Sequence, residues 1–143
     1  MRHGDADSSG DRHLSHKGFV EVSHVLKQAK RMGLSVNAIR SSPLIRARET
    51  AEIARETFGI DYTVTNSLEP EGSPPEIYEE LSTLKGTVLL VSHKPLVSQF
   101  LSDILGKEMH ADFSTGTLAV VSGDPKQGGC IFVSMIPPKI PGS

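Results

Sequence analysis

The first four residues, Met1-Arg2-His3-Gly4, combine residue types that can handle a phosphate group. Arginine carries a permanent positive charge and a planar fork of donors that matches phosphate oxygens. Histidine carries an imidazole that can be neutral and nucleophilic near pH 7. Glycine lets the backbone turn sharply and approach a ligand closely. Together these residues predict a compact anion-binding unit at the start of the chain.

Two later stretches, residues 41–47 (SSPLIRA) and 90–95 (LVSHKP), carry compatible chemistry. Each stretch follows or ends a predicted strand and leads into a predicted helix, so Arg46 and His93 stand close to strand-to-helix crossings. In open α/β sheets, binding sites form at the carboxyl ends of strands, and helix N-termini add N–H donors there. We therefore expect His3, Arg46 and His93 to converge on one anion.

The order of these motifs resembles that of the histidine phosphatase superfamily: Arg-His-Gly, then Ser-Pro-x-x-Arg-Ala, then an apolar strand ending in Ser-His. The small size and the form Ser-His-x-Pro-Leu-Val are most similar to the SixA-type phosphohistidine phosphatase branch. The resemblance extends from residue 2 to about residue 135. It implies a metal-independent hydrolase with a phosphoglycerate-mutase-like fold and no cofactor.

The same resemblance assigns roles to the motif residues. His3 would be the nucleophile that forms a phosphohistidine, and Arg2 and Arg46 would hold the phosphate oxygens. His93 would donate to the phosphate and is expected to be charged or in the correct tautomer. The best match to the family's acidic loop position is Glu69, a candidate general acid. An exposed loop glutamate is an equally ordinary explanation of that residue.

The substrate class follows from how much acid catalysis the leaving group needs. A phosphohistidine releases imidazole, which is a good leaving group, so a phosphorylated protein is the favoured substrate and inorganic phosphate the product. No long insertion follows the Arg46 helix to build a lid, which also suits a side chain on another protein. Two alternatives stay open: a small-molecule phosphomonoesterase of the same fold, and a non-catalytic module that binds phosphate or a partner.

Other polar residues have simpler explanations. Asp5 and Asp7 flank the first motif and could orient the site, although solvated loop carboxylates are commoner. The phosphoglycerate-mutase branch usually carries an asparagine where this chain has Ser9, which argues against a metabolite mutase. The remaining histidines do not show metal-ligand spacing; they are His13, His16, His24 and His110.

The elements that must position these residues alternate between helices and strands. Apolar residues at three- and four-residue spacing predict helices, and β-branched runs predict strands. Helices are expected at 15–32, 44–57, 76–84 and 95–105, strands at 36–41, 61–67 and 87–91, and a hairpin from 117–121 and 130–136. The fold class is therefore α/β, with three layers, a mostly parallel central sheet with helices on both faces, and an antiparallel hairpin at the C-terminal edge.

One departure from the family concerns the N-terminus. By resemblance, a core strand precedes the Arg-His-Gly motif, and here only Met1 does. Two explanations stay open: the chain is a shortened form of the protein, which we favour, or the fold tolerates the loss of that strand. The missing strand would expose a long sheet edge and leave Arg2 and His3 on a free terminus, where precise placement is difficult.

Bulk properties limit the kind of partner. With 143 residues, 37% hydrophobic residues and a formal net charge of −2, the chain reads as one globular domain, residues 1–136, with an irregular tail at 137–143. The near-balanced charge argues against nucleic acid or a charged membrane as partner. A single cysteine, Cys130, and no apolar run of roughly 20 residues predict a cytoplasmic protein. The oligomeric state stays open.

Overall fold

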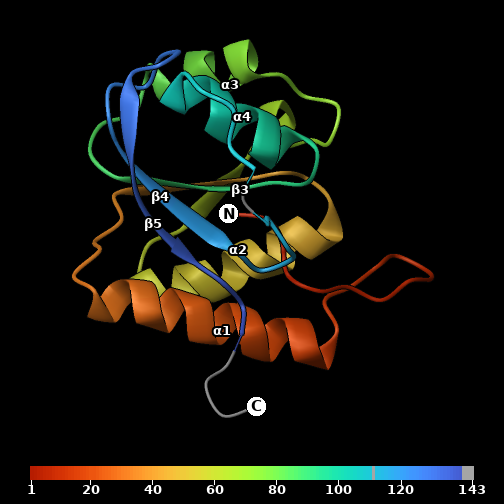
Figure 1. Cartoon of the computed structure of the whole chain (residues 1–143). Helices are drawn as coiled ribbons and strands as arrows, with labels where there is room; N and C mark the ends of the chain where they lie inside the picture. Colours follow the sequence, from red (N-terminus) through yellow and green to blue (C-terminus); the bar gives the residue numbers. More distant parts are fainter. Residues whose placement is uncertain (111, 140–143) are drawn as a thin grey trace.

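The computed structural model describes residues 1–110 and 112–139 (Figure 1). Helices and strands alternate along most of the chain, as the apolar spacing predicts. In order, the elements are α1 (His16–Arg31), β1 (Ala38–Ser41), α2 (Ile45–Phe58), β2 (Tyr62–Val64), the 3₁₀ turn η1 (Asn66–Leu68), α3 (Pro74–Leu81), β3 (Val88–Val91), α4 (Leu96–Leu105), β4 (Leu118–Gly123) and β5 (Cys130–Ile136).

Three parallel strands form the main sheet, in the order β2-β1-β3. The last two strands form a separate antiparallel hairpin, β4-β5, with an irregularity in its register between Val120 and Val121. The predicted α/β class, with a parallel sheet and a C-terminal antiparallel hairpin, is confirmed. β1 and β3 both end at one edge of the sheet, so the residues that follow them lie near each other.

Helices cover the two faces of this arrangement, with α1 and α2 on one side and α3 and α4 on the other (Figure 1). Residues of β3 alternate between the two sides. Leu89 and Val91 belong to the core with α1 and α2, while Val88 and Leu90 pack against the cluster built on α3 and α4. A strand with apolar side chains on both faces reads as a continuous apolar run, which is what the sequence shows at 87–91.

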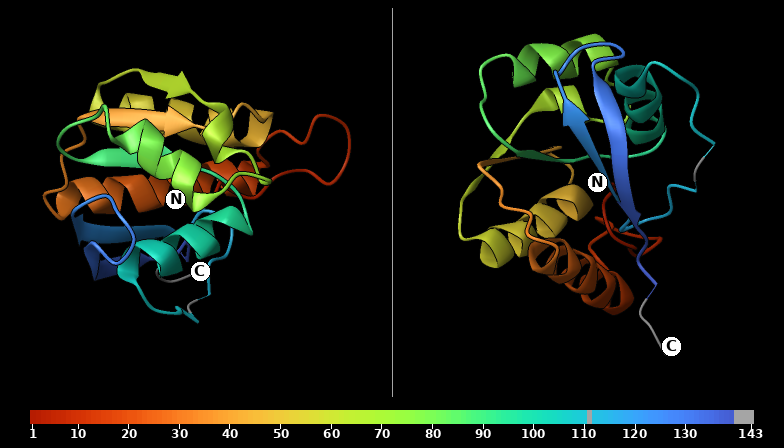
Figure 2. Two further views of the ribbon diagram at one scale, coloured as in Figure 1. Left: turned by 90° about the horizontal axis from the view of Figure 1, so that it is seen from above. Right: turned by 60° about the vertical axis from the view of Figure 1, so that its left-hand side comes forward.

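The N-terminal segment, residues 1–3, lies between the two sheets (Figures 1 and 2). Ser92 donates from its N–H to the carbonyl of Met1 (3.0 Å) and accepts from the N–H of His3 (2.9 Å). On the opposite side, Gly116 donates to the carbonyl of His3 (2.8 Å). The expectation of a loosely placed terminus is therefore wrong, because the backbone of this segment is hydrogen-bonded on both sides and buries Met1 and His3.

Element boundaries differ from the prediction mainly after β2. The extended segment expected at 61–67 ends at Val64, and the chain then turns into η1. Thr65 explains the change, since its hydroxyl accepts a hydrogen bond from the N–H of Ser67 and caps the turn. The last part of the predicted tail, residues 140–143, lies outside the described residues. Across the described ranges, every helix is too short or too polar to cross a membrane.

Candidate active site

Three segments that are far apart in the sequence meet at the carboxyl edge of the parallel sheet. His3 follows the two residues that pair with the end of β3, His93 comes two residues after β3, and Arg46 lies in the first turn of α2. The ring centroids of His3 and His93 are 4.9 Å apart, with an angle of 52° between the ring planes. The structure thus brings together the strand-to-helix connections that carry the sequence motifs.

The hydrogen bond made by His3 fixes which ring nitrogen is free. Its Nδ1 lies 2.7 Å from the carbonyl oxygen of Gly4. A carbonyl oxygen can only accept, so Nδ1 carries the proton and Nε2 of the neutral ring keeps its lone pair. Burial lowers the pKa of His3 to about 4, with smaller effects from the charges of Arg46 and Arg2, and outweighs the Gly4 hydrogen bond. A neutral ring with a free Nε2 is suited to nucleophilic attack.

His93 occupies a fully enclosed position beside His3. Its Nε2 lies 2.7 Å from the hydroxyl of Ser42, which comes directly after β1. Burial, then the neighbouring His3 and the nearby arginines, lower the pKa of His93 to about 3. Of the two states that the sequence left open, these surroundings favour the neutral ring with a fixed tautomer over the charged ring.

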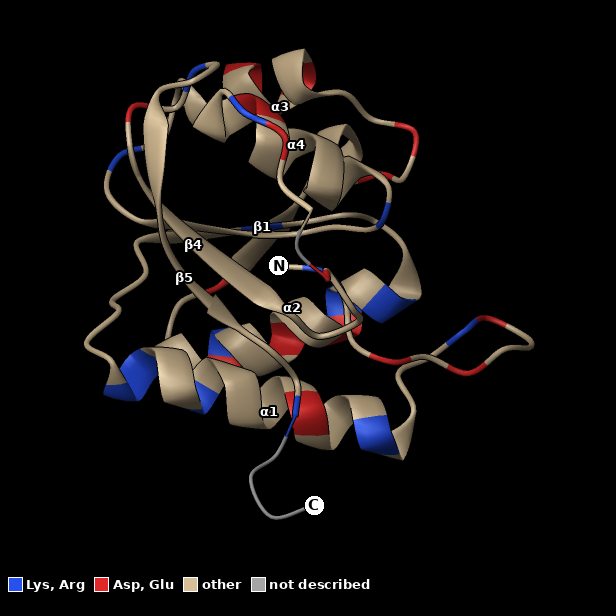
Figure 3. Cartoon of the chain, in the orientation of Figure 1, with Lys and Arg blue, Asp and Glu red and all other residues tan. Residues whose placement is uncertain are grey.

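Three buried nitrogens in this region find no hydrogen-bond partner among the described residues: Arg2 Nε, Arg46 Nε and His93 Nδ1. Buried polar atoms are almost always paired, so a group of unpaired ones calls for a ligand. Burial lowers the pKa of Arg2, against the opposing charge of Asp112, and burial also lowers the pKa of Arg46; the charge of Arg12 lowers both further. Basic positions also gather at the start of α2 in Figure 3. An oxyanion would satisfy both the hydrogen bonds and the charge.

The structure adds a residue that the sequence did not single out, Thr50 of α2. Its fully buried hydroxyl donates to the carbonyl of Arg46 (2.9 Å) and accepts from the N–H of Gly4 (3.0 Å). This hydroxyl ties the first motif to the second. The available signal was its spacing, four residues after Arg46 and therefore on the same helix face.

A second unpredicted residue is Arg12, in the loop that projects beyond the body of the molecule after Gly4 (Figure 1). Arg12 has a φ of 54°, and its Nε donates to the carbonyl of Asp7 (3.3 Å). Its charge makes a small contribution to the lowered pKa of both His3 and His93. The sequence does not single out this arginine, because the composition of a polar loop does not show where its side chains point.

The base of this loop is fixed by carboxylates. The Asp5 carboxylate accepts from the hydroxyl of Ser15 (2.7 Å), and Ser15 in turn caps α1. Glu49 of α2 accepts from the backbone N–H of Leu14 (2.8 Å) and lies 3.1 Å from Nδ1 of His13. Asp5 is therefore partnered and half-buried, whereas Asp7 is exposed.

Glu69 lies directly after η1 and is half-buried. The neighbouring Leu68 accepts a hydrogen bond on its carbonyl from the hydroxyl of Ser92 (2.6 Å), so the backbone of this loop is tied to the residue before His93. This contact places the loop beside the site. Among residues 1–110 and 112–139, no three His, Cys, Asp or Glu side chains are grouped so that they could hold a metal ion.

Comparisons with known proteins agree with this geometry. The sequence model of the Histidine phosphatase superfamily (branch 1) matches residues 1–70. The chain is 28% identical over 141 residues to the phosphohistidine phosphatase SixA homolog of Haemophilus influenzae, which covers 87% of this chain and 86% of that protein. It is 32% identical over 115 residues to a protein of Picosynechococcus sp., covering 73% of this chain and 70% of that protein.

Solved structures extend the likeness to the whole fold. The structure of the protein histidine phosphatase SixA complexed with tungstate superposes with a TM-score of 0.86 at 27% sequence identity, covering 96% of this chain and 94% of that chain. The arrangement is thus the phosphoglycerate-mutase-like α/β fold. With both motif histidines and both motif arginines present in that fold, the chain belongs to the histidine phosphatase superfamily and is a phosphatase of its SixA type.

Proposed function

We propose that this phosphatase removes the phosphoryl group from a phosphohistidine side chain of another protein, through a covalent intermediate on His3. The observation that carries the proposal is the set of unpaired buried nitrogens on Arg2, Arg46 and His93, next to a neutral His3 whose Nε2 is free. The relatives named as phosphohistidine phosphatases support the choice of substrate.

The first step transfers the phosphoryl group to His3. The Nε2 lone pair forms a bond to phosphorus while the phosphorus–nitrogen bond of the substrate breaks, and the leaving imidazole nitrogen takes a proton from a water molecule or from Glu69. Charge on the equatorial phosphate oxygens is then met by Arg2 and Arg46, with His93 Nδ1 within the same enclosure. A water molecule attacks the phosphorus in the second step, the bond to Nε2 breaks, and inorganic phosphate leaves.

Glu69 is the proposed proton donor for substrates that need one. A carboxyl group can protonate a departing alkoxide, which is a poor leaving group, whereas imidazole needs less assistance. Hydrolysis of the proposed substrate therefore depends little on proton donation by Glu69. We place the enzyme in the cytoplasm, because its cysteine, Cys130, is a free thiol buried in β5.

Phosphate trapping tests the proposal directly. The chain, the His3→Ala variant and the matched control His13→Ala would be mixed with a donor protein that carries labelled phosphohistidine. We expect acid-labile label on the chain and on the control, with release of inorganic phosphate, and a loss of at least ~10³-fold in His3→Ala. His13 is a suitable control because it is an exposed histidine that contacts Glu49.

Equal labelling of His3→Ala and the unchanged chain would refute His3 as the nucleophile. Binding of phosphate without label on any form would instead favour a non-catalytic module. Turnover of small phosphate esters that exceeds turnover of the labelled protein would contradict the proposed substrate class while leaving the mechanism intact.

A further inference from the structure

The carbonyl of Gly4 decides which ring nitrogen of His3 carries the proton, so the placement of this peptide unit matters to the nucleophile. His3 Nδ1 lies 2.7 Å from that oxygen. If the oxygen moved away, the ring could carry its proton on Nε2 instead, which would remove the free lone pair there. The Thr50 hydroxyl accepts from the N–H of Gly4 (3.0 Å), but that N–H belongs to the peptide unit before Gly4. The unit that contains the carbonyl needs a support of its own.

The loop that follows Gly4 projects from the body of the molecule and returns to it just before α1 (Figure 1). At this return, Leu14 is half-buried and packs against the core that contains Val22 of α1. A Cβ atom on Gly4 would come within 3.0 Å of Leu14 Cδ2 and 2.7 Å of Val22 Cγ2, so these two side chains enclose the glycine and leave no room for a larger residue. The position of Leu14 therefore limits how far Gly4 can move.

The backbone of Leu14 also pairs with the residues that follow Gly4. Leu14 and Ala6 form an antiparallel bridge. Backbone hydrogen bonds of 2.9 and 3.0 Å flank this bridge and join residues 5–7 to residues 13–15. The bridged pair is therefore of the kind that exchanges no hydrogen bonds, and in such a pair the N–H of Leu14 turns away from Ala6. This N–H needs another acceptor.

Glu49 of α2 supplies that acceptor. Its Oε1 accepts from the N–H of Leu14 (2.8 Å), and its Oε2 lies 3.1 Å from Nδ1 of the exposed His13. The contact with Leu14 leads on to Gly4, whereas the contact with His13 leads to the exposed loop. Glu49 directly precedes Thr50, so two adjacent residues of one helix act on the two sides of Gly4.

From these contacts we propose that Glu49 is a positioning residue for the nucleophile. Its carboxylate holds Leu14 against Gly4, and Gly4 in turn keeps the proton of His3 on Nδ1 and the lone pair on Nε2. Glu49 acts only through these neighbours. The effect on the ring is a property of the folded chain, whereas its consequence for phosphoryl transfer rests on the proposed function.

Nitrogen-15 NMR of the imidazole nitrogens tests the effect on the ring at neutral pH, where His3 is uncharged. The unchanged chain would be compared with Glu49→Ala, Glu49→Gln and the matched control Glu52→Ala. The side chains of Glu49 and Glu52 are 40% and 43% exposed on the same helix, but Glu52 contacts Arg55. We expect Glu49→Ala to shift the tautomer ratio of His3 by at least ~10-fold toward the Nε2–H form. The control and Glu49→Gln should keep the Nδ1–H form, because an amide oxygen can also accept from Leu14.

Phosphate trapping measures the consequence for catalysis. Glu49→Ala should slow labelling of His3 by ~10-fold at a saturating concentration of the donor protein and leave the half-saturating concentration within ~2-fold, since the nucleophile and not substrate binding is altered. Glu49→Gln should recover most of the rate. His13→Ala should leave both quantities unchanged, because it removes only the contact that leads to the exposed loop.

An unchanged tautomer ratio in Glu49→Ala would overturn the proposal, and so would an equal shift in Glu52→Ala. Leu14→Ala gives a second route to the answer, because it keeps the backbone N–H that Glu49 binds and withdraws the side chain from Gly4. It should produce the same shift, and a retained Nδ1–H form in that variant would also contradict the proposal. A tautomer shift in a chain that is never labelled would leave the positioning role of Glu49 standing and refute the proposed function instead.

Discussion

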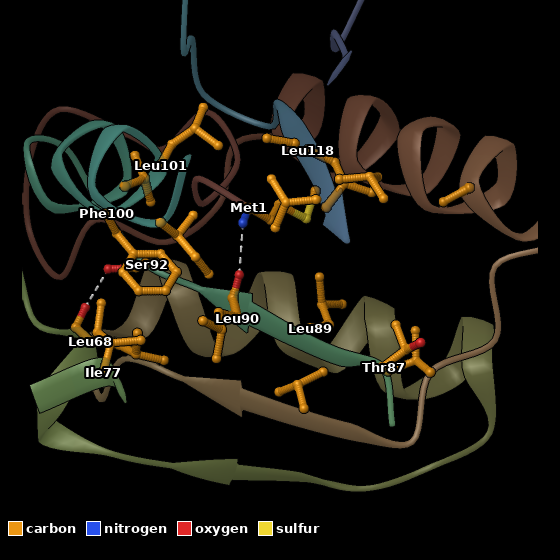
Figure 4. A pocket seen from close by; sticks show the side chains of 18 of the residues that line it. Met1, Leu68, Ile77, Thr87, Leu89, Leu90, Ser92, Phe100, Leu101 and Leu118 are labelled. Carbon is orange, nitrogen blue, oxygen red and sulfur yellow. Dashed lines mark hydrogen bonds between the residues drawn. The ribbon is translucent and has the colours of Figure 1, made fainter. Parts of the chain in front are cut away.

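Two neighbouring regions, the candidate site after Met1 and the space between β3 and β4, differ in the groups that line them. On the carboxyl side of Met1, His3 and Gly4 are enclosed and hydrogen-bonded, and the unpaired atoms nearby are nitrogens that suit a small anion. A cavity of about 150 Å³ between β3 and β4, here called the slot, is lined mostly by apolar side chains together with Met1 (Figure 4). The first region suits a charged ligand, and the second is apolar.

We therefore expect the geometry of the site and the stability of the fold to depend on different contacts. The site is built from short hydrogen bonds between neighbouring segments, such as those of Thr50 and Ser42, which do not involve the slot. Cohesion between the two sheets depends on apolar contact, which the slot interrupts. Changes at the site should therefore alter phosphoryl transfer more than folding, and changes at the slot should do the reverse.

Arg46→Ala should have the largest effect on the site side of this comparison. If the Arg46 guanidinium binds the transferring phosphoryl group as proposed, removing it should reduce labelling of His3 by at least ~10²-fold. The thermal midpoint should change little, because Arg46 is only partly buried. Arg48→Ala is the control, since Arg48 is exposed on the same helix. Similar losses in both variants would mean that general positive charge, and not position, supports the reaction.

Thr50→Val should affect both properties at once. The variant keeps the shape but leaves the N–H of Gly4 without its partner, which costs about 1–3 kcal/mol of unfolding free energy. We expect labelling to fall by about tenfold as Gly4 shifts relative to Arg46. Thr57→Val is the matched control, because the hydroxyl of Thr57 also donates to a carbonyl four residues earlier in α2. Urea titration and phosphate trapping measure the two effects, and equal results for both threonines would remove Thr50 from the site.

The buried histidines make stability depend on pH. In the folded chain, the pKa of both histidines lies below the ordinary 6.5, at about 4 for His3 and about 3 for His93. The unfolded chain therefore binds more protons than the folded chain below about pH 6.5. Their contribution is complete above that pH and is lost as the pH falls through about 4 for His3 and about 3 for His93.

Thermal midpoints recorded between pH 7.5 and pH 4.5 check this dependence. The midpoint should fall with pH, and it should fall less steeply in His93→Gln. A midpoint that rises as the pH is lowered would contradict the neutral, buried state of both rings.

Glu69→Gln should have the smallest effect on the proposed substrate. Turnover of a phosphohistidine donor should change by less than ~3-fold, whereas hydrolysis of an aryl phosphate should fall by ~10²-fold if Glu69 is the acid. Glu71→Gln, at an exposed position in the same loop, serves as the control. Intact ester hydrolysis in Glu69→Gln would exclude Glu69 as the acid and weaken the phosphomonoesterase alternative.

The sequence predicted the elements of the fold because their periodicity is local. Residues 15–32 and 95–105 show helical spacing of apolar side chains, and the structure has α1 and α4 there. The role of Thr50 does not follow from local periodicity, because it depends on a partner distant in sequence, and that of Arg12 was not predictable, because the composition of a polar loop does not show where its side chains point. Thr50 bonds to a residue 46 positions away.

The sequence by itself indicated the family and the α/β order of elements, and it singled out the two histidines and two arginines of the candidate site. Their residue types and spacing are what suggested phosphate chemistry. Only the tertiary structure decided that His3 is neutral with Nε2 free, because that state depends on burial and on the Gly4 carbonyl. It also decided that residues 1–3 are held between two sheets, since backbone hydrogen bonds to Ser92 and Gly116 leave no trace in residue type.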